Sequence, residues 1–447
     1  MRTIALPILA ALATLTGAAH AAPLTADEAV RIALQKNSLV IQSEASVLDA
    51  RSGLWSAYSR VLPNVSADVT RNGSFVEESR GTQLFGTTPL ASSSFDSERY
   101  SGSYGLSGSW SVLNLSSLTG LSSSRQSMKA AQFTRRATRA DVVLETKRRF
   151  YEVVKAVHLA GVSSQALHLS RDDERRVRAL FEVGSVSKSD LLKAQVRTST
   201  SQLDSLVADH TVTFQRIRLA EQLGVGEGNL GDVDTTLTAA HQSIDAGAVL
   251  AAARTARPDV RAAEASVKAA ELGLRSAHWA RLPNLSVTGG YTPQSVSTSK
   301  LFDSPQHDNE GSSNFKSLRG WNGSVSVNMD VFDGFATDAA VAAARARLIR
   351  SRETRDALLR NLGSQVRQAT LAYQEAIERE DLAGATVASA SENLHLVQQK
   401  YNVGSATILD LIDSQVQLQR AQSDLVSALA AIRVAEAALD RVRGQGE

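Results

Sequence analysis

The sequence has no cysteine among its 447 residues. This absence excludes disulfide frameworks, thiolate zinc sites, iron–sulfur clusters and catalytic thiols. Lys and Arg number 48 against 46 Asp and Glu, with no basic block, so the charge pattern of a nucleic-acid-binding protein is also missing. Past the first residues, no apolar run reaches the ~18 residues that a membrane-spanning helix needs. A chain of this kind that spans a membrane has to do so with strands.

The amino-terminal residues have the pattern of a cleaved secretory signal. Arg2 precedes an apolar run over residues 4–15, and small side chains follow at Ala19 and Ala21. The run is too short to anchor the chain in a bilayer. We therefore expect residues 1–21 to be a signal peptide that is removed on export.

An internal duplication with an offset of 220 residues organises the chain. Three short motifs recur in one register: Glu44-Ala45-Ser46-Val47 at 264–267, Leu62-Pro63-Asn64 at 282–284 and Val183-Gly184-Ser185 at 403–405. The unit is far longer than a solenoid repeat. We expect a first repeat over 22–229, a linker over 230–242, a second repeat over 243–442 and a tail over 443–447.

Each repeat contains two stretches in which apolar and polar residues alternate. This period of two is typical of strands with one wet face. The predicted strands cover about 64–76, 99–113, 284–292 and 320–332, with polar loops at 77–98 and 294–319. Tyr100, Trp110, Tyr291 and Trp321 fit the interfacial aromatic positions of a membrane barrel. A soluble sandwich with one exposed face is the alternative.

The remaining segments have a helical period. Residues 25–61 begin with Thr25 and Glu28 at capping-box spacing, and the stretches 120–182 and 335–402 contain no proline. As continuous helices these stretches would be about 95–100 Å long. The segment Asp172–Arg176 indicates a solvated helix face.

The final helix carries a heptad seam that predicts close helix packing. Its large residues are Leu411, Leu418, Leu425, Ile432 and Leu439, and its small residues are Ser414, Ala421, Ala428 and Ala435. The equivalent seam of the first repeat is looser, with Leu192, Val196, Leu203, Leu206 and Ile217 interrupted by Ser199, His210 and Thr213. The sequence therefore predicts two long helical hairpins and four strands. Four strands cannot close a membrane barrel, which needs about eight, so we expect several chains to pool their strands.

No catalytic constellation is present. The Gly226–Gly231 segment has dinucleotide-loop spacing but follows a helix rather than a strand. Ser185 and Lys188 have the spacing of penicillin-binding enzymes without the accompanying Lys-Thr-Gly. The eight histidines form no metal-binding pair. We expect no enzyme activity, no cofactor and no metal.

Several short motifs resemble the TolC-type outer-membrane efflux proteins, or outer membrane factors. They are the Leu-Pro-Asn entry to the first strand of each repeat, Val331-Phe332-Asp333-Gly334 after the last strand, and Tyr401–Ser405 before Ile408–Leu411. The resemblance covers essentially the whole chain after the signal. It implies a mainly α fold with membrane β structure, in which duplicated helix–strand–strand–helix halves build a homotrimer. Three chains would form a 12-stranded barrel in the outer membrane and a helical coiled-coil barrel extending into the periplasm.

The resemblance also implies a function and partners. The trimer would be the channel of a tripartite efflux or type I secretion system, working with a periplasmic adaptor (membrane fusion protein) and an inner-membrane transporter. Two alternatives are a periplasmic helical-hairpin adaptor and a coiled-coil scaffold. An adaptor would carry a lipoyl-like β-domain between the arms of one hairpin, whereas this sequence shows two hairpins and two strand pairs.

The resemblance assigns site residues by position. The pore aperture falls on Asp410 and Asp413, matched in the first repeat by Asp190 and Lys193. The adaptor-docking tips fall on Val183, Gly184, Ser185, Val403, Gly404 and Ser405. Carboxylates gathered in a narrow ring would raise one another's pKa and favour cations. Tyr401 matches a closed-state contact, but the family's best-known member has an Arg where this chain has Ala406, so that contact is made differently here or is absent.

Overall fold

The computed structural model of the chain describes residues 23–81, 84–85, 88–89, 93–226, 228, 230–238, 242–302, 311–316 and 320–445. The expected signal peptide lies outside these residues. The chain divides into two units, each drawn from both repeats. Among the described residues, the helical unit comprises those within 23–43, 136–257 and 361–445, and the strand unit those within 44–135 and 258–360.

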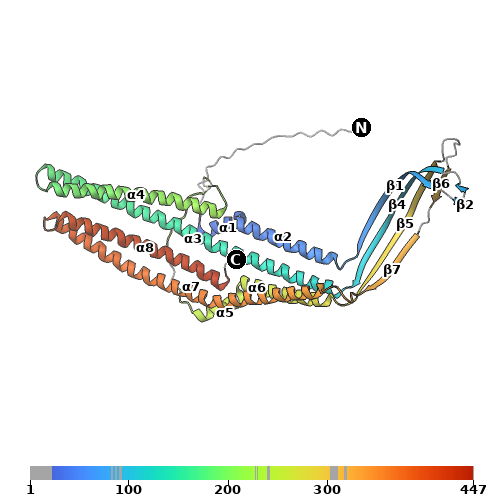
Figure 1. Ribbon diagram of the computed structural model, residues 1–447. Coiled ribbons are helices and arrows are strands. Elements are labelled where there is room, and N and C mark those ends of the chain that lie inside the picture. The colour runs from blue at the N-terminus through green and yellow to red at the C-terminus, as the bar shows by residue number, and fades with distance from the viewer. Residues whose placement is uncertain are drawn as a thin grey trace, which may run out of the picture. The chain divides into compact units, whose positions relative to one another are not determined.

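The order of elements repeats within the chain, as the sequence motifs predict (Figure 1). The first repeat contains α1 (Ala26–Lys36), α2 (Ser38–Ser59), β1 (Asn64–Gly81), β4 (Ser93–Leu113), α3 (Leu115–Glu182) and α4 (Lys188–Leu223), with a two-stranded β2 (Leu84–Phe85) and β3 (Thr88–Pro89) between β1 and β4. The second contains α5 (Ala246–Ala256), α6 (Pro258–Trp279), β5 (Asn284–Phe302), β6 (Gly311–Lys316), β7 (Gly320–Asn328), α7 (Ala336–Asn402) and α8 (Ile408–Arg443). The bounds of α1, α2 and α4 recur in α5, α6 and α8 at the offset of the motifs.

The first helical segment of each repeat is broken, which the sequence pattern did not predict. Asn37 interrupts residues 25–61: its Nδ2 donates to the carbonyl oxygen of Gln222 at 2.8 Å, and its Oδ1 accepts from the N–H of Leu39 at 2.8 Å. In the second repeat Arg257 takes the equivalent position before Pro258 and donates to the side chain of Gln365. Thr25 still caps α1, since its Oγ1 accepts from the N–H of Glu28 at 3.3 Å.

Glycines at equivalent positions end α4 and α8. Gly224 and Gly444 have φ of 68° and 82°, the left-handed conformation that closes many helices. A Cβ on Gly224 would lie 2.5 Å from the carbonyl oxygen of Lys36, and one on Gly444 would lie 3.0 Å from the carbonyl carbon of Ala256. Both the backbone conformation and the close approach therefore require glycine.

We expect Gly224→Ala to lower the free energy of unfolding by about 2 kcal/mol or more, because the left-handed conformation alone costs about 1–2 kcal/mol for other residues. Thermal unfolding followed by far-UV circular dichroism measures the effect. Gly228→Ala is the matched control, since a Cβ there meets no heavy atom within 4 Å. Equal midpoints for the two variants would show that the approach of Gly224 to Lys36 is not tight.

The helical unit is built on the hairpins α3–α4 and α7–α8, whose long helices are continuous as predicted: α3 has 68 residues and α7 has 67. Most of the predicted seam of α8 is buried: Leu411, Ile432 and Leu439 almost fully, and all four small residues, while Leu418 and Leu425 are half-buried. In contrast, every apolar residue predicted for the α4 seam is exposed: Leu192, Val196, Leu203, Leu206 and Ile217. Within the described residues, no helix is long and apolar enough to cross a bilayer.

The main sheet of the strand unit is antiparallel, in the order β1-β4-β5-β7, with β6 preceding β7 along the same edge of β5. β1 and β5 extend into the predicted loops, to Gly81 and Phe302. The sequence did not predict the extension of β1, because residues 77–80 show no alternation of apolar and polar residues. β7 ends at Asn328, short of the predicted 332. Asn328 pairs with Asn284, the first residue of β5, so the alternating residues beyond it have no strand to pair with.

Candidate functional site

The α3–α4 hairpin turns sharply at the residues expected to dock an adaptor. The N–H of Gly184 donates to the carbonyl oxygen of Phe181 at 2.9 Å, and the N–H of Ser185 donates to that of Leu180 at 2.8 Å. The φ of Gly184 is 75°. Val183 is left 73% exposed at the tip.

The α7–α8 tip has the same construction. Gly404 donates to Tyr401 at 3.0 Å and Ser405 to Lys400 at 2.9 Å through the backbone, and φ of Gly404 is 76°. Val403 is 78% exposed. A Cβ on either tip glycine would meet no heavy atom within 4 Å, so backbone conformation rather than space requires glycine. Each hairpin thus presents an exposed valine on a fixed turn.

Asp190 of the first repeat is held by its own helix terminus. Ser187 Oγ accepts from the Asp190 N–H at 3.1 Å and donates to Asp190 Oδ2 at 2.7 Å, and Lys193 Nζ lies 3.2 Å from Asp190 Oδ1. The Ser187 hydroxyl bond, followed by the Lys193 bond, lowers the pKa of Asp190. Lys193 therefore offsets the charge of Asp190 on the same helix.

Asp410 of the second repeat closes a complete capping box with Thr407. The N–H and Oγ1 of Thr407 donate to Asp410 Oδ2 at 2.8 and 2.7 Å, and the N–H of Asp410 donates back to Thr407 Oγ1 at 3.2 Å. These bonds, the hydroxyl bond first, lower the pKa of Asp410. Within one chain, the shift is therefore opposite to the rise expected in a ring of carboxylates.

We expect Thr407→Ala to cost about 1 kcal/mol, the usual effect of losing an N-cap. Amide hydrogen exchange in the first turn of α8, over Ile408–Leu411, should accelerate. Because the folded pKa of Asp410 is depressed, its contribution is present above the unfolded pKa of about 4 and is lost as pH falls through the folded value. Wild-type exchange, corrected for intrinsic rates, should approach that of the variant in acid. Identical exchange in both proteins at neutral pH would contradict the cap.

Asp413 lies on the same exposed face of α8 as Asp410. This exposed face comprises Asp410, Asp413, Gln417, Arg420, Asp424, Ser427 and Ala431. The spacing alternates between three and four residues, which keeps one stripe on one side of a coiled-coil helix. Gln417 Nε2 donates to Asp413 Oδ2 at 2.8 Å. The fold therefore brings both aperture candidates onto one wet face.

Tyr401 packs into an apolar cluster that joins the two hairpins near their tips. The buried members are Val177, Ala194, Ile408 and Leu411, one or two from each of α3, α4 and α8, and Tyr401 of α7 packs against them. Burial raises the pKa of the Tyr401 hydroxyl, and the charge of Asp173 raises it further. The predicted closed-state residue thus lies where all four helices meet.

The expectation of a solvated face over Asp172–Arg176 is wrong for Asp173, which is 8% exposed. Its Oδ2 accepts from Gln415 Nε2 at 2.6 Å, and one turn further along α8, Gln419 Oε1 accepts from Arg197 at 3.0 Å. Burial raises the pKa of Asp173, while the Gln415 bond opposes the rise. α8 is therefore linked to α3 and α4 by two polar bonds. The sequence did contain a sign of these polar contacts, because Gln415 and Gln419 lie one turn apart at the edge of the apolar seam of α8.

The sheet has one apolar and one hydroxyl-bearing face, as the alternation predicts. Trp110 pairs in register with Val287, which pairs with Val325, so these three side chains share the apolar face. The opposite face is tied by side-chain hydroxyl bonds between neighbouring strands: Ser66–Ser107 at 2.8 Å, Ser286–Ser326 at 2.7 Å and Thr288–Ser324 at 2.7 Å.

Aromatic residues mark the apolar face. The rings of Tyr291 and Trp321 stack across strands with centroids 4.2 Å apart. Trp110 Nε1 donates to the carbonyl oxygen of Val61 at 2.9 Å. The side chain of Tyr100 lies outside the described residues. Three of the four predicted interfacial aromatics are therefore placed on one face.

Comparisons with known proteins agree with this architecture. The sequence model of the family described as "Outer membrane efflux protein" matches residues 249–445. The chain is 22% identical to outer membrane protein TolC of Vibrio cholerae serotype O1, with 73% of each chain covered. It is 25% identical to outer membrane efflux protein BepC of Brucella suis, covering 66% of this chain and 61% of the relative.

The fold is similar to that of solved structures. The outer membrane channel CmeC of Campylobacter jejuni matches with a TM-score of 0.77 at 17% identity, over 94% of this chain and 86% of that one. The sequence relatives and the shared fold agree with the duplicated helix–strand–strand–helix plan. The second repeat, residues 249–445, therefore resembles the outer membrane efflux protein family, and the chain shares the fold of solved outer membrane channels.

Proposed function

We propose that three copies of this chain form an outer-membrane channel that passes substrates from an inner-membrane transporter and a periplasmic adaptor. The observation that carries the proposal is the sheet. Its four-strand path has β1 and β7 at its two edges, one apolar face and one face lined by hydroxyl groups. Four strands are too few to close a barrel, whereas three such sheets joined at their edges give the 12 strands that the family resemblance implies. The apolar face would meet lipid and the hydroxyl face water.

The exposed stripe on α4 supports the same assembly. Further from the tip, Leu203, Leu206 and Ile217 recur at coiled-coil spacing, yet all three are exposed in a single chain. An apolar seam of this length costs free energy unless another helix covers it. A neighbouring copy supplies that helix in a trimer.

The hairpin tips and the groove beside them would receive the adaptor. A groove of about 500 Å³ runs between α4 and α8 next to the tips, and its apolar residues are Leu192, Val196, Leu409, Ile412 and Val416. Its position just after both tip turns supports docking of an apolar helix there. The proposal includes the inner-membrane transporter and the adaptor. It also includes removal of the signal peptide after Ala21 before the chain inserts into the outer membrane. The adaptor and scaffold alternatives receive no support from the fold or the relatives.

Purification in mild detergent tests the assembly. Light scattering should give about three times the mass of one mature chain, which is slightly below 47.7 kDa for the full sequence, and the protein should fractionate with the outer membrane. A stable monomer in the soluble periplasmic fraction would contradict the proposal.

Asp410 and Asp413 would form the narrow, cation-selective end of the channel. We expect Asp410→Asn/Asp413→Asn to weaken both cation selectivity and block by multivalent cations in single-channel recordings. An asparagine at position 410 keeps an amide oxygen that can accept from the N–H and Oγ1 of Thr407, so the capping box is retained. Lys193→Ala, which leaves Asp190 unneutralised, should strengthen selectivity. Asp424→Asn is the control, since Asp424 lies on the same exposed face further from the tip. Equal recordings for wild type and the double variant would show that these are ordinary surface acids.

A further inference from the structure

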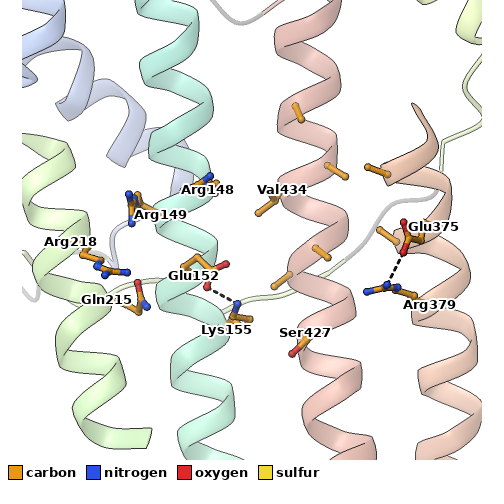
Figure 2. Close-up of a pocket in the computed structure, with 16 residues that line it drawn as sticks. Arg148, Arg149, Glu152, Lys155, Gln215, Arg218, Glu375, Arg379, Ser427 and Val434 are labelled. Carbon is orange, nitrogen blue, oxygen red and sulfur yellow. Dashed lines mark ion pairs between the residues drawn. The ribbon is translucent and has the colours of Figure 1, made fainter. Parts of the chain in front are cut away.

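A groove in the helical unit is lined by all four long helices and is separate from the tips. It has a volume of about 590 Å³. Figure 2 shows α4, α3, α8 and α7 contributing side chains to it. This volume is within the roughly 300–1,000 Å³ typical of pockets for small organic ligands.

The floor of the groove is apolar. It consists of small side chains from α7 and α8: Ala372, Ala376, Ala430, Ala431, Val434, Ala435 and Ala438. Such a surface makes few directional contacts and accepts a flat apolar body by burial of area alone. The floor therefore selects for an apolar face rather than for a particular shape.

The rim of the groove carries more positive than negative charge. Its cations are Arg148, Arg149, Lys155, Arg218 and Arg379, against the carboxylates of Glu152 and Glu375. Lys155 pairs with Glu152 at 2.5 Å and Arg379 with Glu375 at 2.6 Å, as Figure 2 shows. These two pairs neutralise the rim beside α7 and α8.

The excess charge lies on α3 and α4. Arg148 and Arg149 both pair with the single carboxylate of Glu145, at 3.3 and 2.7 Å. The Arg218 guanidinium stacks on the ring of Phe214, 4.3 Å from its centroid. Stacking fixes a guanidinium without neutralising it. Two arginines thus share one carboxylate, and a third is held by an aromatic ring, at one side of the apolar floor.

We infer that this groove binds amphiphilic organic anions, with the anionic groups at Arg148, Arg149 and Arg218 and the apolar body on the alanine floor. Guanidinium groups suit carboxylate, sulfonate and phosphate oxygens because their paired N–H donors match those oxygens.

The groove continues the exposed face of α8 that begins with the aperture carboxylates. Ser427 and Ala431 belong to both the face and the groove. Ala431 lies 18 residues after Asp413, about 27 Å along the helix. Under the proposed function this face lines the tunnel, so the wall would change from acidic at the tip to basic further in. This placement rests on the proposed function, whereas binding itself does not.

Equilibrium dialysis of naphthalene-1,5-disulfonate against the full chain in zwitterionic nanodiscs at low ionic strength tests the binding. We expect saturable binding to wild type, weakened at least about fivefold in Arg148→Gln/Arg218→Gln through loss of two charge-assisted contacts. Arg420→Gln, on the same face of α8 but outside the groove, should bind like wild type. Neutral naphthalene-1,5-diol should bind the double variant and wild type equally.

A second variant and a second measurement test separately whether the groove binds the anion and whether the groove faces the tunnel. Ala431→Glu places a carboxylate on the floor and should also abolish disulfonate binding. In single-channel recordings the disulfonate should reduce wild-type conductance more than that of Ala431→Glu. No saturable binding, or equal binding by wild type and both groove variants, would overturn the proposal while leaving the channel intact. Binding without any effect on conductance would support the site and contradict the tunnel-facing orientation.

Discussion

Val325→Arg/Val327→Arg should remove the protein from the outer membrane. Both valines lie on the apolar face of β7, paired in register with Val287 and Leu285 of β5. An arginine facing lipid costs about 2–4 kcal/mol near the bilayer midplane, so two on one strand cost a large part of the stability of a typical protein. We expect outer-membrane fractions to contain little folded trimer, measured by immunoblotting of unheated samples.

The opposite face of the same strand supplies the control. Ser324 and Ser326 alternate with the two valines and bond through their hydroxyl groups to Thr288 and Ser286. Ser324→Arg/Ser326→Arg adds the same charge to the face proposed to meet water, and we expect a normal amount of trimer. If both double variants insert equally well, the apolar face does not contact lipid.

Gly184→Trp and Gly404→Trp should each reduce export by more than about tenfold, a factor that corresponds to only 1.4 kcal/mol of lost docking free energy. Both glycines hold a left-handed turn at a tip with open space around the Cα. A tryptophan strains the turn and covers the exposed valine beside it. The amount of trimer should stay unchanged, because neither position contacts the helical core.

Gly404→Asn separates the two effects of the tryptophan. Asn adopts the left-handed conformation more readily than other residues that have a Cβ, so the turn should persist and most export should remain. Export at the wild-type rate in both tryptophan variants would show that the tips are not the docking surface. Loss of trimer in those variants would instead assign the glycines to folding.

Periodicity predicted most of the fold because the same patterns occur twice. The heptad pattern of α8 correctly predicted buried residues, because Leu411, Ile432 and Leu439 are covered by helices of the same chain. The helix break at Arg257 had a local signal, because Pro258 follows it and the residue before a proline is disfavoured in a helix. The break at Asn37 had none, because its partner Gln222 is distant in sequence. Long-range contacts of this kind leave no local pattern.

The site was predicted less completely than the fold. The tip turns follow directly from a glycine after a helix, and the structure places them where the motifs do. The burial of Asp173 could not be read from its charged neighbours, since only its position opposite Gln415 distinguishes it from Asp172. The capping role of Asp410 could have been predicted from the sequence, because Thr407 precedes it by three residues. Asp410 was instead interpreted only as an aperture residue.

Pairing between the edge strands of neighbouring copies is the central claim, and disulfide cross-linking tests it most directly. The chain has no cysteine, so Ala67→Cys on β1 combined in turn with Gly323→Cys, Val325→Cys or Val327→Cys on β7 gives one thiol on each edge. Two strands separate β1 from β7 within a chain, about 14 Å at normal strand spacing, which is too far for a disulfide inside one chain. At least one pair should give oxidised dimers and trimers on non-reducing gels, with no larger species. Monomers alone in all three pairs, or a ladder continuing beyond three, would contradict a closed trimer.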